Sequence, residues 1–231
     1  MVQVSQPVHH IPLLENGDRL TRDEFERRYA RMPNVKAELI EGVVYMAAAL
    51  RYRRHGNPHS YMVAWLALYG ANTPGVEPAD NTTVRLDADN EPQPDVLLRL
   101  EESYGGQSTV SDDDYLEGAP ELVVEIAAST ASYDLHDKLN AYRRNGVQEY
   151  LVWLVEDQEF RWYDLQCGRY VLQEPNTQGV LQSRCFPGLC LAVDALLDGN
   201  MVKVLDTQQV ALKSDIHTRF VARLSISDAD V

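Results

Sequence analysis

Apolar residues recur at helical spacing in three separate stretches of the chain. In residues 58–69 (PHSYMVAWLALY), Met62 and Trp65 lie on one face, and a proline at the first position favours the start of a helix. The TRDE pattern that begins residues 21–32 is typical of a capping box and predicts a shorter helix before the next proline. Residues 194–224 alternate apolar and polar positions at the same spacing, and predict helices packed on the edge of the domain.

The middle of the chain contains apolar runs that predict buried strands. The run 121–127 (ELVVEIA) is nearly continuous, and 149–155 (EYLVWLV) is a second such run. Between them, residues 134–145 have helical character and end at Gly146, a residue that tolerates a left-handed helix cap. Strand, helix and strand joined by short connections form a crossover unit, which predicts a parallel strand pair.

Shorter patterns predict the remaining strands. Residues 37–47 read as two strands around a tight Glu41-Gly42 turn, or as one strand bent there. The other expected elements are strands at 82–86 and 94–100, a mobile loop rich in Gly, Ser and Asp at 101–118, and a hairpin of 160–165 with 170–173. Together these elements predict a mixed α/β domain.

Composition narrows the function classes. The chain has 231 residues, 45% of them hydrophobic, which is enough for one large domain or one domain with an appendage. The formal charge of −14 argues against a protein that coats nucleic acid through a broad basic surface. Without an apolar run long enough to span a membrane or the apolar core of a signal peptide, we expect a cytoplasmic protein that makes no membrane contact. Three cysteines without a C-x-x-C pair predict buried free thiols.

Two carboxylates occupy positions where burial is expected. Asp95 follows Pro94 at the start of one predicted strand, and Glu125 lies within another. A buried carboxylate must shift its pKa, pair with a cation or hold a metal, and two on neighbouring strands could share one Mg²⁺. The structural alternative is that Asp95 caps a loop and Glu125 pairs with Arg99 or Arg143.

The helix after Glu125 carries a second group of polar residues. Asp134, Lys138 and Tyr142 are four residues apart and project from one helix face. In isolation this pattern favours an ion pair beside a half-buried tyrosine. A lysine next to two metal-binding carboxylates would instead suit phosphodiester hydrolysis, because its charge offsets the charge that builds on the phosphorane.

Four segments in a fixed order resemble a known protein family. They are AELIEG with Glu38, PQPDVLL with Asp95, PELVVEIA with Glu125, and YDLHDKLNAYRRNGVQEYLVW with Asp134 and Lys138. This combination is similar to the Uma-type family of restriction endonucleases, within the PD-(D/E)XK nuclease superfamily. The resemblance covers about residues 19–197 and implies a restriction-endonuclease-like core, a central mixed sheet flanked by helices. We expect residues 1–18 to form an N-terminal tail and 198–231 a C-terminal helical extension.

The resemblance also implies roles for individual residues. Asp95 and Glu125 would be metal ligands, and Glu38 would contact the metal or its water, with Mg²⁺ as the implied cofactor and Mn²⁺ as a substitute. The superfamily places its lysine two residues after the second acid, where this chain has Ala127. Lys138 on the following helix would replace it, as in Uma-type sequences.

Other polar residues near these segments have simpler interpretations. His59 matches a family histidine and could face the site, but a helix cap or a surface position is the simpler expectation. Glu41 is expected to serve the turn and Tyr142 to serve packing. The basic run Arg51, Arg53 and Arg54 is either a local phosphate-binding patch or a solvated loop.

Three functions follow from these residues. The first is a Mg²⁺-dependent endonuclease acting on DNA through Glu38, Asp95, Glu125 and Lys138, with a homodimer as a reasonable assembly. The second is a non-catalytic module that keeps the nuclease fold for assembly or partner binding, since fold does not imply function. The third is a hydrolase of small phosphorylated molecules, which the acidic composition would suit better than DNA.

Overall fold

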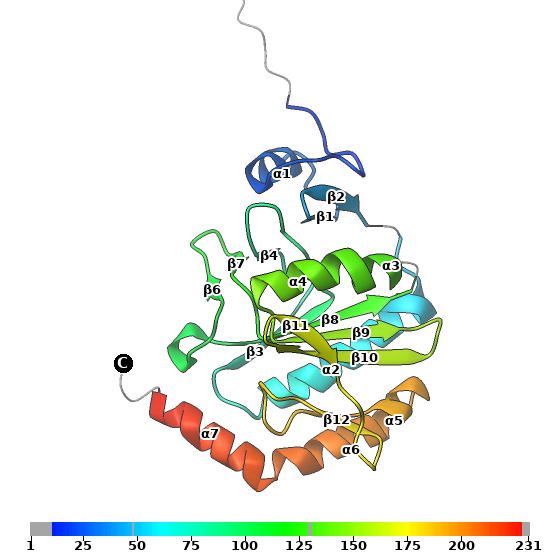
Figure 1. The fold of residues 1–231 in the computed structure, drawn as a ribbon, viewed down its shortest axis with the longest axis vertical. Helices are drawn as coiled ribbons and strands as arrows, with labels where there is room; N and C mark the ends of the chain where they lie inside the picture. Colours follow the sequence, from blue (N-terminus) through cyan, green and yellow to red (C-terminus); the bar gives the residue numbers. More distant parts are fainter. Residues whose placement is uncertain (1–10, 48, 129–130, 228–231) are drawn as a thin grey trace, which may run out of the picture.

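The computed structural model describes residues 11–47, 49–128 and 131–227, and a six-stranded mixed sheet forms its centre (Figure 1). The strand order is β11-β10-β9-β8-β5-β3, in which β8 and β9 are parallel and all other neighbours are antiparallel. The strands are β3 (Val76–Asp80), β5 (Val96–Leu100), β8 (Leu122–Ala127), β9 (Glu149–Leu154), β10 (Glu159–Gln166) and β11 (Arg169–Leu172). The predicted hairpin of β10 with β11 is confirmed.

The connection between β8 and β9 crosses one face of the sheet. It consists of α3 (Ala131–Tyr133), a π-helical turn η3 (Asp134–Lys138) and α4 (Leu139–Asn145), and it ends at Gly146 with φ of 86°. Tyr142 of α4 is fully buried in a core shared with β8 and β9. The predicted crossover unit with its parallel strand pair is therefore confirmed.

Helices from two distant parts of the chain cover the opposite face (Figure 1). They are α2 (Asn57–Gly70), α5 (Val193–Leu197), α6 (Met201–Leu212) and α7 (Asp215–Ser227). Trp65 of α2 packs edge-to-face on Trp162 of β10, with ring centroids 5.9 Å apart. The helices that the sequence predicts at 58–69 and 194–224 are confirmed, and residues of α6 and α7 belong to the same core as α2.

A small N-terminal unit packs around its own core. It contains α1 (Arg22–Tyr29) and the antiparallel hairpin of β1 (Ala37–Ile40) with β2 (Val43–Met46). Glu41 and Gly42 have φ of 54° and 71°, as the two central residues of a tight hairpin turn require. Residues 37–47 are thus two strands around a turn, and not one bent strand.

Short elements complete the fold and correct several expectations. Residues 101–118, expected to form a mobile loop, contain a 3₁₀ turn and two short strands, and residues 82–86, expected to form a strand, contribute only a two-residue strand. The peripheral elements are η1 (Tyr52–Gly56, a π-helical turn), β4 (Val84–Arg85), η2 (Glu102–Tyr104, a 3₁₀ turn), β6 (Thr109–Val110), β7 (Leu116–Glu117), β12 (Val180–Gln182) and β13 (Cys190–Ala192). The parallel pairing of β4 with β7 places residues 84–85 beside residues 116–117.

Local chemistry explains two further differences. Thr21 is the N-cap of α1, but its side chain makes no capping bond, and the Glu24 carboxylate accepts hydrogen bonds from Arg27 and Arg28. The capping-box prediction is therefore wrong in its contacts, although the helix forms. All three cysteines are free, but Cys167 in the hairpin turn is exposed and not buried. Among the described helices, none combines the length and apolar character that crossing a membrane requires.

One buried acid gives the fold a pH-dependent stability. Burial raises the pKa of Glu149 to about 7, against the opposing effect of hydrogen bonds from the Ser183 hydroxyl and two backbone N–H groups. In the unfolded state Glu149 loses its proton near the ordinary pKa of 4.5, whereas in the folded state it keeps the proton up to about pH 7. The stability that the protonated Glu149 contributes is therefore lost as pH rises through 7.

We expect the free energy of unfolding of the wild-type protein, measured by urea denaturation, to fall between about pH 4 and about pH 8 by on the order of 3 kcal/mol more than that of Glu149→Gln. The exposed control Glu174→Gln should behave as wild-type; equal pH profiles for both variants would contradict the assignment.

Candidate functional site

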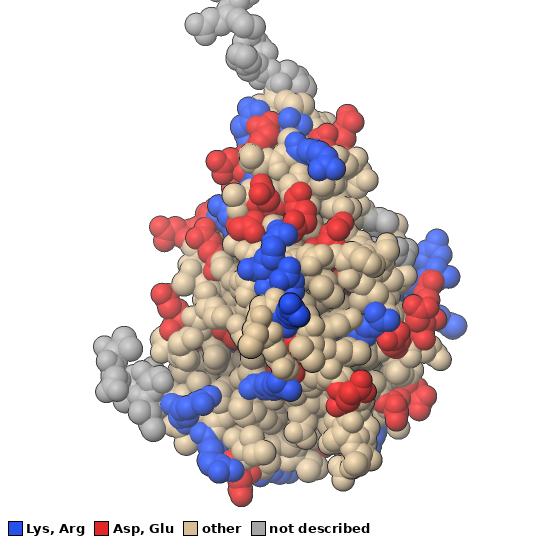
Figure 2. All heavy atoms as spheres, viewed as in Figure 1, with Lys and Arg blue, Asp and Glu red and all other residues tan. Residues whose placement is uncertain are grey.

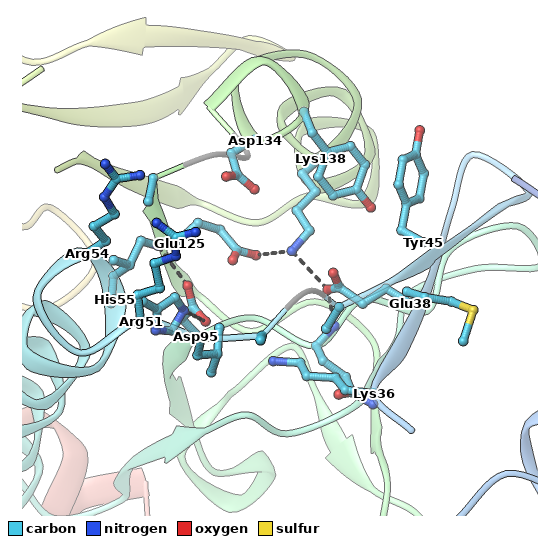
Figure 3. Close-up of a pocket in the computed structure, with 18 residues that line it drawn as sticks. Lys36, Glu38, Tyr45, Arg51, Arg54, His55, Asp95, Glu125, Asp134 and Lys138 are labelled. Carbon is cyan, nitrogen blue, oxygen red and sulfur yellow. Dashed lines mark hydrogen bonds and ion pairs between the residues drawn. The ribbon is translucent and has the colours of Figure 1, made fainter. Parts of the chain in front are cut away.

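A cavity of about 370 Å³ lies where the N-terminal hairpin meets the central sheet. Its walls come from β1 and β2, from η1, from the adjoining ends of β5 and β8, and from η3 (Figure 3). These segments are separated by long stretches of sequence, and the fold brings them to one place. All four predicted site residues, Glu38, Asp95, Glu125 and Lys138, line this cavity.

Sheet register places the two expected metal ligands beside each other. Val96 of β5 pairs with Val124 of β8 in an antiparallel arrangement, so Asp95 and Glu125 occupy the next cross-strand position on the same face. The Asp95 carboxylate also accepts a hydrogen bond from the backbone N–H of Ile126 at 2.8 Å. Both side chains are buried, with 6% and 3% of the residue surface exposed. The two carboxylates therefore come from neighbouring strands and line the same cavity.

Lys138 links two of the acids across the cavity (Figure 3). Its ammonium lies 2.9 Å from Glu38 Oε1 and 3.0 Å from Glu125 Oε1. The Tyr142 hydroxyl donates to the same oxygen of Glu125 at 2.8 Å. Tyr142 therefore contacts the site through its hydroxyl as well as packing in the core, which the packing interpretation did not anticipate.

The structural alternative for Glu125 is wrong. Arg99 pairs with Glu77, its cross-strand neighbour on the edge strand, and Arg143 donates to the Gly168 carbonyl. Among the described residues, the Glu125 carboxylate instead accepts hydrogen bonds from Lys138 on η3 and Tyr142 on α4. The turn role expected for Glu41 is confirmed by its positive φ.

Sequence reasoning missed the histidine that contacts Asp95. His55 Nε2 lies 3.0 Å from Asp95 Oδ1, whereas His59 is 2.9 Å from the Asp95 backbone carbonyl oxygen. The family histidine thus supports the backbone at this position, and its neighbour one turn earlier reaches the carboxylate. Within the described part of the chain, buried His55 Nδ1 has no hydrogen-bond partner. The only signal in the sequence is the four-residue spacing of the two histidines, of which His55 precedes α2 and His59 lies in its first turn.

The acids of the cavity have opposite pKa shifts. Burial alone would raise the pKa of Asp95, but hydrogen bonding and charge from His55, the charge of Lys138 and the Ile126 N–H lower it overall. For Glu125, burial and the neighbouring carboxylates raise the pKa well above its usual value, despite the charge of Lys138. Two acids on one face of the sheet therefore hold their protons differently.

Lys138 remains cationic in these surroundings. Burial disfavours the charged ammonium, but Glu125, Glu38 and Asp134 together raise its pKa well above the usual value. Figure 3 shows the side chain extending from η3 between the labelled carboxylates. A charged group at this place can stabilise negative charge, and is poorly suited to accept a proton.

The donor set suits a hard divalent cation. Asp95 and Glu125 offer carboxylate oxygens from adjacent strands, and such oxygens are the ligands that Mg²⁺ prefers. Over the described ranges, no three His, Cys, Asp or Glu side chains are gathered closely enough to form a complete metal site. Two carboxylates with water and substrate oxygens as further ligands are consistent with how Mg²⁺ is usually held.

The chain is similar to known proteins in sequence and in fold. The model of the Uma2 family, described as "Putative restriction endonuclease", matches residues 22–194. Among solved structures, the chain is similar to a putative nuclease belonging to DUF820 from Anabaena variabilis, with a TM-score of 0.58 and 14% identity over 74% of this chain and 96% of that chain. No curated protein matches. At this identity the structural likeness shows a shared fold, and the predicted mixed sheet flanked by helices is confirmed.

Removal of the Lys138 ammonium should lower the free energy of unfolding. Lys138→Met leaves Glu38 and Glu125 buried without their shared partner, and breaking a buried ion pair from one side typically costs about 3–5 kcal/mol. We expect a loss of that order in urea denaturation at neutral pH, and partial recovery in Lys138→Met/Glu125→Gln. Lys203→Met, at an exposed position on α6, is the matched control. Equal stability of the two single lysine variants would show that the bridge contributes little.

Proposed function

The chain belongs to the Uma2 family of restriction-endonuclease-related proteins, and on this premise we propose that it is a Mg²⁺-dependent endonuclease that hydrolyses DNA phosphodiester bonds. The observation that carries the proposal is the convergence of Glu38, Asp95, Glu125 and Lys138 in one buried cavity. These residues come from β1, from the beginning of β5, from β8 and from η3. Buried charge of this density has a stability cost that a mere binding module has no reason to bear.

Asp95 and Glu125 would hold the divalent cation, and Glu38 would hold a water molecule on the same side of the cavity. When bound there, Mg²⁺ supplies Lewis-acid stabilisation of the phosphate oxygens and lowers the pKa of a bound water. His55 and the Ile126 N–H keep the Asp95 carboxylate in a fixed orientation through both of its oxygens. Tyr142 holds Glu125 in the same way from the side of α4.

Lys138 would act as an electrostatic group. Its ammonium lies between two carboxylates and keeps its charge, so it can offset the additional negative charge that develops on phosphorus during hydrolysis. A raised pKa makes this lysine a weak general base at neutral pH. Proton removal from water would then fall to a carboxylate, for which Glu38 is the candidate because Asp95 and Glu125 would hold the cation.

The metal site can be tested without knowledge of the substrate. We expect wild-type protein to bind Mn²⁺ in titration calorimetry, and Asp95→Asn and Glu125→Gln to lose that binding, because each removes one carboxylate ligand. Asp113→Asn is the matched control, since this exposed aspartate pairs with Arg85 and is not among the residues that line the cavity. Binding that persists in both site variants would show that these carboxylates do not hold the metal.

Cleavage provides the second test. Asp95→Asn and Glu125→Gln should lose Mg²⁺-dependent cleavage of DNA, whereas Lys138→Met should keep Mn²⁺ binding and lose roughly 100- to 1000-fold in turnover, as expected for removal of one stabilising charge. Folding of each variant is checked by circular dichroism at the assay temperature. Full cleavage by Lys138→Met would contradict the electrostatic role of the lysine.

A further inference from the structure

The functional groups lie at the bottom of the cavity and not on the surface. Asp95, Glu125 and Lys138 expose 6%, 3% and 4% of their surface. In a regular duplex the phosphates follow the outside of a wide cylinder, which a cavity of about 370 Å³ cannot admit. A nucleotide that is not stacked in a duplex can enter the cavity and bring its phosphate to the carboxylates.

The aromatic part of the lining lies beside the polar groups. Tyr45 is the cross-strand neighbour of Glu38, its ring centroid is 4.1 Å from that of Tyr133, and the Lys138 ammonium lies 5.5 Å from the Tyr133 ring centroid. Met46 and Leu50 add apolar side chains to the lining. The cavity is at the small end of the range for small-molecule sites, so it has room for one nucleotide, whose flat base suits the aromatic and apolar side chains and whose phosphate suits the polar ones.

The entrance differs in charge from the rest of the protein. Four carboxylates and four Lys or Arg residues line the cavity, so its lining is formally neutral in a chain of net charge −14. Within the described ranges, Lys36 bonds to the neutral Asn81 amide alone, and the Arg51 guanidinium has neither a hydrogen-bond nor an ion-pair partner. Both are available to phosphates on either side of a nucleotide in the cavity.

Two apolar side chains are exposed next to these cations. Tyr52 is 76% exposed and Leu50 is 63% exposed, immediately beside Arg51. An exposed aromatic ring next to a free guanidinium is the arrangement that single-strand-binding proteins use to stack a base and hold its phosphate. Leu50 and Arg51 line the cavity, and Tyr52 directly after them begins the π-helical turn η1 that places His55 in the cavity lining.

We propose that the cavity takes one nucleotide of single-stranded or locally unpaired nucleic acid, with its phosphate toward Asp95 and Glu125 and its base against Tyr45. The next base stacks on Tyr52, and Arg51 and Lys36 hold the flanking phosphates. This inference rests on the proposed function and specifies its substrate class. The net charge of −14 disfavours the alternative of a duplex held by many phosphate contacts, and Figure 2 shows Lys and Arg interspersed with Asp and Glu on the face viewed, without one broad basic patch.

Binding of a fluorescein-labelled oligonucleotide of about 15 nucleotides, single-stranded and as a duplex of the same sequence, tests the proposal by fluorescence anisotropy in EDTA. We expect the single strand to bind at least about tenfold more tightly. Tyr52→Ala should weaken single-strand binding by about 5- to 50-fold and Tyr52→Phe should retain it, because stacking needs the ring and not the hydroxyl. Because the Tyr52 side chain is exposed in the folded protein, both variants should fold as the wild-type protein does.

The salt dependence adds a measurement that stacking does not affect. Two phosphates held by Lys36 and Arg51 predict a slope of log K against log salt of about −1.4, and Arg51→Gln should reduce its magnitude by about 0.7. Arg169→Gln, an exposed arginine on the edge strand β11, makes the same charge change and should leave the slope unaltered. A slope that falls equally in both variants would overturn the assignment of Arg51.

The outcomes separate this inference from the proposed function. Equal binding of both DNA forms, tighter binding of the duplex, or wild-type affinity in Tyr52→Ala would overturn the single-strand proposal. Mg²⁺-dependent cleavage of duplex DNA under those circumstances would leave the proposed endonuclease function standing. Absence of binding to either form overturns the single-strand proposal, and absence of Mg²⁺-dependent cleavage of both forms as well would overturn the endonuclease proposal.

Discussion

The ion bridge of Lys138 with Glu38 and Glu125 is the contact on which the site depends. It joins the N-terminal hairpin, the central sheet and the crossover connection through a single ammonium group. Such a contact is favourable only when its geometry is good and further hydrogen bonds satisfy the remaining polar atoms. The Gln93 N–H donates to Glu38 at 2.7 Å and Tyr142 donates to Glu125, so both carboxylates have a second donor.

The sheet, and not the ion bridge, sets the position of Asp95. The antiparallel register of β5 with β8 fixes the Asp95 and Glu125 backbones side by side. The two π-helical turns then deliver their side chains from opposite sides: η1 brings His55 to Asp95, and η3 brings Lys138 to Glu125. Wide helical turns of this kind are rare and occur mostly at functional sites, because they aim a side chain that a regular helix would direct elsewhere.

The sequence is sufficient to predict the core elements and the buried acids, because both follow from local pattern. A charge inside an apolar run must find a partner, and that alone singles out Glu125. The edge strand β3 was not predicted, because its VEPAD sequence is polar and contains Pro78, which an edge strand tolerates. His55 was missed because its contact with Asp95 spans 40 residues and depends on the geometry of η1.

The packing of the N-terminal unit has a consequence for the lifetime of the complete site. Glu38 belongs to a hairpin whose apolar residues pack in a core separate from the two cores of the central sheet. Proteins open locally along such divisions at a lower free energy than global unfolding requires. We therefore expect the fraction of molecules in which Glu38 faces Lys138 to depend on the opening equilibrium of one small unit, which amide hydrogen exchange in β1 would report separately from the stability of the sheet.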